Sequence, residues 1–225
     1  MRQIALDTET TGIGHETGHR IIEIGCVELI NRQLTGRTFH TYLNPKRAVD
    51  EGAFRVHGIS DHFLQDKPLF ASIVTDFLYF IDDAELIIHN AVFDLGFLNA
   101  ELRRMAHPKS IETHCSVLDT LPLARKKHPG QRNSLDALCK RYDVDNAHRQ
   151  LHGALLDAHL LAHLYLAMTG GQTDLFVDTT LTPAASQTAC IAVLPLTSNS
   201  PVYFATSEEL QRHEAFLEKL KKNRL

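Results

Sequence analysis

Three strand-like segments in succession near the N-terminus most constrain the fold of this chain. The stretch 2–12 begins with an apolar run, residues 20–30 are rich in β-branched side chains, and residues 38–43 form a shorter run that ends at Asn44-Pro45. Connections this short favour antiparallel pairing, because a parallel pair needs a crossover of a dozen or more residues. The sequence therefore predicts an antiparallel meander at the start of the domain.

Helical and strand-like patterns alternate in the next part of the chain. Apolar side chains recur at helical spacing over residues 68–81, residues 85–89 form a short buried strand, and Asn90 is expected to cap a helix that runs to about residue 105. We expect a fifth strand at 111–117 and further helices near 48–56, 118–127, 134–142 and 153–168. The alternation predicts an α/β fold whose mixed sheet is covered by helices on both faces.

Composition limits the class of protein and its location. The formal net charge is -4, so any contact with nucleic acid must be local rather than driven by a basic surface. The 4 cysteines lie far apart without C-x-x-C spacing, which argues against a zinc finger and a disulfide framework. Apolar runs are far shorter than the roughly 18 residues of a membrane span, and we see no signal core. A reducing cytoplasm, without a membrane partner, is expected.

Asp7 and Glu9 are the first candidate site residues. They lie two positions apart in a strand, so their side chains point to the same face. Like charges this close repel, which raises a pKa or requires a counter-charge, and the strand offers no neighbouring lysine or arginine. A divalent cation such as Mg²⁺ or Mn²⁺ would satisfy the pair. Two solvated acids at a strand end are the simpler alternative.

Two further acids are expected to point inward from helices. Asp157 shares a helical stripe with apolar side chains at spacings of three, four, seven and eleven, and Asp94 lies in line with Phe97 and Leu98. A buried charge needs a cation or several hydrogen-bond donors. A helix-start Asp can be held by free N–H groups, and Asp157 could form a salt bridge. The combination with Asp7 and Glu9 favours a shared metal site.

His152 is the candidate base. It precedes Asp157 by five residues, an offset of about 140° on an ideal helix, so the two do not share a helical face. Because Gly153 separates His152 from the helix, we expect the imidazole on the approach loop, beside a metal-bound water. A structural or exposed histidine is the alternative.

Three short motifs follow one another along the chain: Asp-Thr-Glu-Thr-Thr-Gly at 7–12, His-Asn-Ala-Val-Phe-Asp at 89–94 and His-Gly-Ala-Leu-Leu-Asp at 152–157. In this order they resemble the three exonuclease motifs of the DEDDh 3′–5′ exonucleases. Within that family the chain is similar to the proofreading subunits of bacterial DNA polymerase III, closely over residues 1–172. The similar segments outside the motifs are 21–25, 54–59, 132–139, 166–172 and, in the tail, 202–209.

The resemblance implies a ribonuclease H-like fold, in which a five-stranded mixed sheet is flanked by helices and the strand of Asp7 is central. It implies that Asp7, Glu9 and Asp157 bind two Mg²⁺ or Mn²⁺ ions directly and also contact the substrate. Asp94 would hold one ion through water, and His152 would be the general base. The implied activity is hydrolysis of the terminal phosphodiester of mismatched DNA 3′ ends, single-stranded or frayed, by a two-metal mechanism.

One position departs from the family pattern. Relatives commonly carry a Glu five residues before the histidine that matches His57, and this Glu helps to grip the 3′-hydroxyl of the terminal nucleotide. Here that position is Gly52, with Glu51 beside it. His57 therefore carries over as a substrate-binding residue. Either Glu51 reaches the sugar after a local shift, or backbone groups near Gly52 replace the missing side chain.

The composition changes after residue 171. We expect an exonuclease domain over 1–171, a flexible Thr-, Ala-, Ser- and Pro-rich linker over 172–200, and a short tail over 201–225. Gln172, Leu175 and Phe176 resemble the pentapeptide with which bacterial replication proteins bind the sliding clamp. By the same resemblance the tail binds the alpha subunit of DNA polymerase III. The sequence does not decide whether the polymerase core has a small third subunit.

Two other functions are compatible with parts of this pattern. A stand-alone DEDDh exonuclease acting on RNA or short oligonucleotides would use the same site, but it would not need a linker and a tail. A degenerate nuclease that serves only as a binding scaffold would not need all five site residues. The sequence favours the proofreading enzyme.

Overall fold

The computed structural model describes residues 1–146, 151–170 and 206–207. The chain divides into two units, Met1–Phe176 and Val177–Leu225, and the fold is described for the first. The expected clamp-binding motif and linker lie outside the described residues, as does the expected tail apart from residues 206–207.

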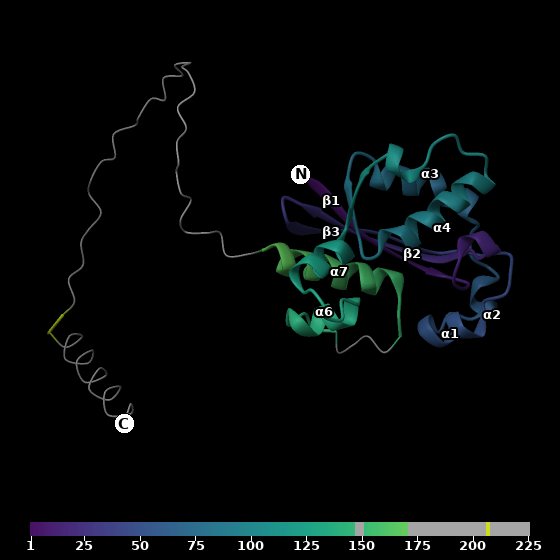
Figure 1. The fold of residues 1–225 in the computed structure, drawn as a ribbon. Helices are drawn as coiled ribbons and strands as arrows, with labels where there is room; N and C mark the ends of the chain where they lie inside the picture. Colours follow the sequence, from purple (N-terminus) through teal and green to yellow (C-terminus); the bar gives the residue numbers. More distant parts are fainter. Residues whose placement is uncertain (147–150, 171–205, 208–225) are drawn as a thin grey trace, which may run out of the picture. The chain divides into compact units, whose positions relative to one another are not determined.

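The first unit is built on a five-stranded sheet, with the order β3-β2-β1-β4-β5 (Figure 1). Its strands are β1 (Arg2–Thr10), β2 (Ile21–Ile30), β3 (Gln33–Tyr42), β4 (Glu85–Ile88) and β5 (Ser116–Asp119). The β1–β2 and β2–β3 pairs are antiparallel, whereas β1–β4 and β4–β5 are parallel. The expected mixed sheet with a central first strand is confirmed.

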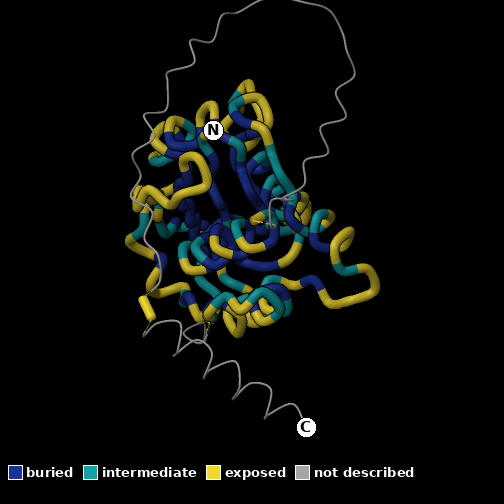
Figure 2. Tube along the Cα trace, turned by 90° about the vertical axis from the view of Figure 1, so that its left-hand side faces the viewer, coloured by how far each residue is buried: buried dark blue, intermediate teal, exposed yellow. Residues whose placement is uncertain are grey.

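Different helices cover the two faces of the sheet. Leu6 of β1 packs in a core with α3 (Phe70–Ile81) and α4 (Ala91–Arg104). Ala5 points to the opposite face and packs against α7 (Ala154–Thr169). Figure 2 shows the buried residues concentrated in the strands and in the helix sides that face them. Because both faces are covered, β1 and β2 are buried along nearly their whole length.

Shorter helices complete the unit. Helices α5 (Thr120–Lys127) and α6 (Leu135–Arg141) pack against α7. Leu64 of α2 (Asp61–Leu64) packs in a small cluster with Ile22 of β2, and Val49 and Ile59, which flank α1 (Glu51–His57), belong to the same cluster. Within residues 1–146 and 151–170, no helix is both long enough and apolar enough to cross a lipid bilayer.

Some local predictions were wrong. The strand expected at 111–117 begins only at Ser116, because Ile111–Thr113 form a 3-10 turn whose apolar residue Ile111 is buried in the core. Strand β3 starts five residues earlier than expected, after a two-residue turn in which Asn31 and Arg32 both have positive φ. Such turns usually contain glycine, which is absent here, so the hairpin signal was weak. The short helix α2 gave no periodic signal.

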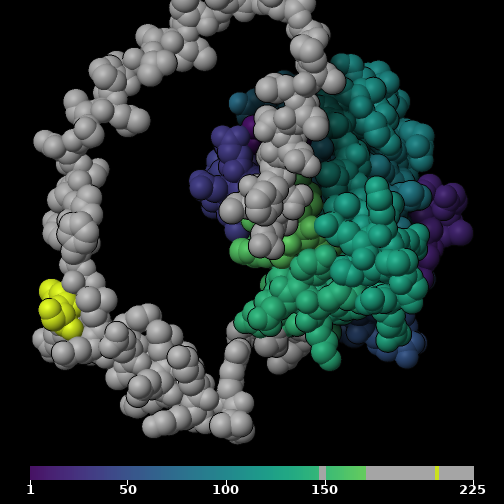
Figure 3. Space-filling view, turned by 60° about the vertical axis from the view of Figure 1, so that its left-hand side comes forward, coloured from purple at the N-terminus to yellow at the C-terminus, as the bar shows by residue number. Residues whose placement is uncertain are grey.

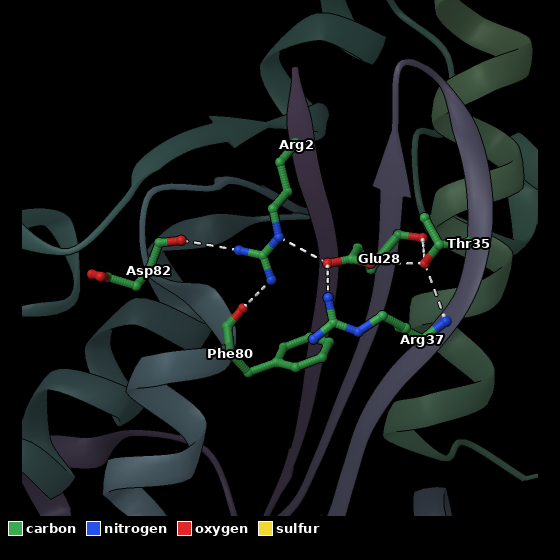
Figure 4. A network of polar contacts seen from close by, with 6 residues as sticks. All are labelled: Arg2, Glu28, Thr35, Arg37, Phe80 and Asp82. Atoms are coloured by element: carbon green, nitrogen blue, oxygen red, sulfur yellow. Dashed lines mark hydrogen bonds and ion pairs between the residues drawn. The ribbon is translucent and has the colours of Figure 1, made fainter.

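A network of polar contacts closes the end of the sheet away from Asp7 and Glu9 (Figure 4). Glu28 of β2 is fully buried and accepts hydrogen bonds from Arg2 at 2.8 Å, Thr35 at 2.9 Å and Arg37 at 3.1 Å. The Arg2 guanidinium also donates to backbone carbonyls near the end of α3. Burial raises the pKa of Glu28, but the contacts with Arg2, Thr35 and Arg37 outweigh it and hold the pKa below its usual value.

Candidate active site

A small cavity of about 190 Å³ lies at the carboxyl-terminal ends of β1 and β4. This is the edge at which open α/β sheets commonly bind ligands. The cavity is lined by Asp7, Thr8, Glu9, His89, Asn90, Phe93, Asp94, Leu135, His152 and Asp157. The structure thus brings together the four acids and the histidine of the three motifs. Among these described lining residues there is no lysine or arginine.

Strand alternation places the first two acids. Ala5, Asp7 and Glu9 point to the face that α7 covers, and Ala5 packs directly on that helix. Thr8 points to the opposite face, where its hydroxyl donates a 2.7 Å hydrogen bond to Asp94 of α4. One strand therefore supplies two cavity carboxylates and anchors a third.

Gly25 brings the fourth acid into place. It pairs with Asp7 across the β1–β2 ladder. A Cβ atom at this glycine would lie 2.2 Å from the carbonyl carbon of Ala154 and 2.3 Å from the Leu155 nitrogen, so only glycine lets the first turn of α7 rest on the strand. This close approach positions Asp157, which is almost fully buried. A glycine inside a strand is the signal that could have revealed this contact.

Glu9, His152 and Asp157 form a close cluster in the cavity. Their candidate ligand atoms all lie within 4.8 Å of one another. His152 precedes α7, as its spacing indicated, and its Nδ1 lies 3.6 Å from Oδ2 of Asp157. The His152 side chain is 42% exposed, and its backbone N–H donates to the Val56 carbonyl of α1. The cluster can hold a cation, with an imidazole open to solvent beside it.

Asp94 has an unusual electrostatic environment. Burial raises the pKa of its carboxyl, and the hydrogen bond from Thr8 only partly offsets this effect. The nearby charge of Asp119 raises the pKa further. The proton would be released if a cation entered the cavity, because an opposite charge favours the ionised form.

Asn90 stands at the N-cap of α4, as predicted, but its side chain does not supply the cap. Asn90 occupies the N-cap position with φ 70° but makes no side-chain capping bond. Instead, the Asp119 carboxylate accepts 3.0 Å hydrogen bonds from the N–H groups of Asn90 and Ala91, and it also caps α5 through Leu121. A cap supplied by a distant strand leaves no local sequence signal. Its consequence is that the Asn90 side chain lines the cavity.

The predicted sugar-binding residues do not line this cavity. His57 is buried at the end of α1, and its Nδ1 accepts a 3.0 Å hydrogen bond from the Ile59 N–H. Burial lowers the His57 pKa, a neighbouring backbone contact raises it in part, and the charge of His152 lowers it again. Glu51 and Gly52 are exposed in the first turn of α1, where the Glu51 carboxylate lies 3.7 Å from Arg55.

Fold and site together define a class of enzyme, the exonucleases. The model of the exonuclease family RNase_T matches residues 4–165, a span that contains all three motifs. A solved structure of exonuclease X in complex with 5′ overhanging duplex DNA has a TM-score of 0.59 and 26% identity. The similarity covers 75% of this chain and 90% of that one.

Relatives that align over nearly the whole chain identify the particular family within the exonucleases. DNA polymerase III subunit epsilon of Salmonella typhimurium is 55% identical over 229 residues, and that of Escherichia coli K12 is 53% identical. Each comparison covers 98% of this chain and 94% of the relative. The chain therefore belongs to the epsilon subunits of DNA polymerase III, which are proofreading 3′–5′ exonucleases. Metal dependence is typical of the wider family, and epsilon subunits have partners in the polymerase core.

Proposed function

We propose that the cavity binds two divalent ions, Mg²⁺ or Mn²⁺. Asp7, Glu9 and Asp157 would bind them directly, and Asp94 would hold one through water. The observation that carries this proposal is the convergence of four acids from distant segments on one cavity of about 190 Å³. Carboxylate oxygens are the ligands that hard cations prefer, and the described lining supplies no basic side chain instead.

The bound ions supply charge neutralisation on the phosphate and an activated water. His152 then acts as the general base. Its imidazole can take the proton of the attacking water near neutral pH, and Nδ1 lies 3.6 Å from Oδ2 of Asp157. Because the His152 side chain is 42% exposed, it passes the proton on to solvent.

The substrate of this site is the 3′-terminal nucleotide of a DNA strand, single-stranded or frayed at a mismatch. We assign His57 to the terminal sugar, because His57 lies beside His152 at the end of α1. Gly52 offers backbone groups and open space, since a Cβ atom there would meet nothing within 4 Å. Glu51 points to Arg55 and reaches the sugar only after a local shift.

The remaining assignments concern the division of the chain into segments, most of which after residue 170 lie outside the described residues. We assign residues 1–171 to catalysis, 172–200 to a linker and 201–225 to contact with the polymerase alpha subunit. Gln172, Leu175 and Phe176 would engage the sliding clamp at the start of the linker. Such a tether raises the effective concentration of the nuclease at the primer end. A small third core subunit is compatible with this arrangement.

The epsilon relatives, aligned with 98% of this chain, support these assignments. The proposed location is the cytoplasm, where Cys26 and Cys115 stay reduced thiols.

The test is hydrolysis of primer–template DNA that ends in a paired or a mismatched 3′ nucleotide. With Mg²⁺ or Mn²⁺ we expect 5′-monophosphates to be released faster from the mismatched end, and no release in EDTA. An RNA oligonucleotide of the same sequence serves as the competing substrate. Equal rates with and without metal, or a preference for RNA, would contradict the proposal. Leu175→Ala with Phe176→Ala should abolish clamp binding and leave hydrolysis of free DNA unchanged.

A further inference from the structure

A second and larger cleft lies next to the catalytic cavity, and the proposed function does not use it. Its volume is about 830 Å³, and it shares His89 and Asn90 with the catalytic cavity. Its lining consists of His89, Asn90, Leu121, Arg125, Pro129, Gly130, Gln131, Asn133 and Ser134. Sites for drug-sized ligands have about 300–1,000 Å³. The catalytic cavity is below that range, so a DNA strand must extend beyond it.

The wall of this cleft is fixed by hydrogen bonds. His89, at the end of β4, contacts the Asn133 carbonyl at 2.9 Å through Nε2 and the Thr120 hydroxyl at 2.9 Å through Nδ1. The Asn133 amide in turn donates to the carbonyls of His128 and Gln131. Segment 128–134 is therefore held in place before any ligand arrives, which lowers the entropic cost of binding.

The cleft is also positively charged. Arg125 is its one charged lining residue, since a lowered pKa keeps the His89 imidazole neutral, and no acid is present among the described lining residues. Helix α5 ends in Arg125, Lys126 and Lys127, and Figure 3 shows the region of α5 and α6 at the surface, in teal and green. Burial chiefly lowers the pKa of His89; the contact with the Asn133 carbonyl and the charge of Asp119 raise it in part, and the charge of Arg125 lowers it. An anionic ligand fits this environment.

The position of the cleft gives a direction to the bound strand. In the sheet, β1 has β2 on one side and β4 on the other. Val49 and Ile59, on either side of α1 and its His57, pack on the β2 side in the cluster around Ile22. The cleft opens on the β4 and β5 side. A strand whose terminal sugar lies at His57 and whose scissile phosphate lies over Asp7 therefore leaves past Asn90.

We propose that this cleft binds the single-stranded DNA segment directly 5′ to the scissile phosphate. Arg125 contacts a phosphate of the second or third nucleotide from the 3′ end, and the amides of Asn90 and Gln131 bind the same segment. Asn90 is available for this role because Asp119 caps α4 in its place. The inference rests on the proposed function of the catalytic cavity and adds a subsite to it.

The test is Arg125→Gln in the full chain, assayed with Mn²⁺ on two substrates. One is the p-nitrophenyl ester of thymidine 5′-monophosphate, which has no upstream nucleotides, and the other is a thymidine hexanucleotide. We expect kcat/KM for the hexanucleotide to fall about tenfold, mainly through KM, and its logarithmic salt dependence to weaken by about 0.7 for the lost phosphate contact. Hydrolysis of the ester should not change. Arg125→Lys should restore part of the loss, since lysine binds phosphate as a point charge.

Arg103→Gln is the matched control, because Arg103 is an exposed α4 residue outside both cavities. It should behave as wild type on both substrates. Wild-type kinetics and salt dependence of Arg125→Gln on the hexanucleotide would overturn the inference. So would a loss confined to binding of polymerase core proteins, which would mark a protein contact. Failure of the wild-type chain on both substrates would instead overturn the proposed function, and this inference with it.

Discussion

Buried carboxylates lie at both ends of the β1–β2 ribbon, Glu28 on β2 itself and Asp94 on α4 beside Thr8 of β1, and their surroundings have opposite effects on the pKa. At one end, Glu28 is surrounded by Arg2, Thr35 and Arg37, and its pKa is held below the usual value. At the other end, Asp94 is equally hidden from solvent, and burial raises its pKa. The same strand pair therefore has a charge-paired carboxylate at one end and, packed against its other end, a carboxylate whose ionisation is unfavourable.

The difference separates a structural charge from a functional one. A buried acid paired with arginines inside the fold needs nothing further, and its removal leaves the arginines without their partner. The catalytic cavity instead gathers four acids within a described lining that offers no lysine or arginine. Repulsion among them is a cost to the folded protein that a divalent cation can offset, as expected where function opposes stability. Substitutions at the two ends should accordingly have opposite effects.

The largest effect is expected from Asp157→Asn. The substitution keeps the shape of the side chain but removes a proposed metal ligand, so kcat should fall at least about 10³-fold on DNA. Without metal, the melting temperature should stay the same or rise, because one repelling charge is gone. Steady-state kinetics and thermal unfolding in EDTA measure the two effects. A wild-type kcat in this variant would show that Asp157 is not a metal ligand.

Gly25→Ala should disturb the catalytic end without changing any charge. The added methyl group would lie 2.2 Å from the backbone of Ala154, so the first turn of α7 must move. We expect kcat to fall about 10²-fold, as a misplacement of about 1 Å can cause, together with a lower free energy of unfolding. Kinetics and urea denaturation test this. Gly52→Ala is the control for stability, since its methyl group meets nothing within 4 Å and should raise stability by about 0.5–1 kcal/mol.

Glu28→Gln should do the reverse of Asp157→Asn. We expect a loss of about 1–3 kcal/mol in the free energy of unfolding with kcat unchanged. The estimate lies below that for a fully buried pair because the Arg2 and Arg37 side chains are 26% and 62% exposed. Urea denaturation measures the loss. Arg37→Gln should cost less than about 1 kcal/mol, and an equal cost for both variants would contradict the assigned roles.

The pH dependence of stability gives the smallest but most selective effect. Asp94 has a folded-state pKa above the ordinary 3.8, so the folded metal-free protein retains a proton that the unfolded chain releases. The Asp94→Asn substitution should therefore be more stabilising at pH 8 than at pH 5. Glu28 has a folded-state pKa below the ordinary 4.5, so its contribution is complete above pH 4.5 and is lost as the pH falls through the folded-state value.

Urea denaturation in EDTA at several pH values checks both signs. The cost of Glu28→Gln should be the same at pH 6 and pH 8 and should shrink near pH 4. An Asp94→Asn effect that is independent of pH would show that burial does not raise the Asp94 pKa.

Local patterns in the sequence were sufficient for much of the fold and for the candidate residues. The apolar and β-branched runs of β1 and β2 are sufficient to predict both strands, and the helical spacing of Asp157 relative to apolar residues indicates that it points inward. The contributions of Gly25 and Asp119 could not be predicted in the same way. Gly25 acts through a helix that follows much later in the chain, and Asp119 caps a helix that starts 28 residues before it. Both depend on contacts that exist only after the sheet has formed.

The most direct test of the account is a titration of the metal-free full chain with Mn²⁺ in the presence of thymidine 5′-monophosphate, followed by electron paramagnetic resonance of the free ion. We predict two bound ions per chain for the wild type and for Glu28→Gln, and loss of at least one ion in Glu9→Gln. Equal binding by all three proteins, or no binding by the wild type, would contradict the claim that the catalytic carboxylates bind the divalent ions and Glu28 does not.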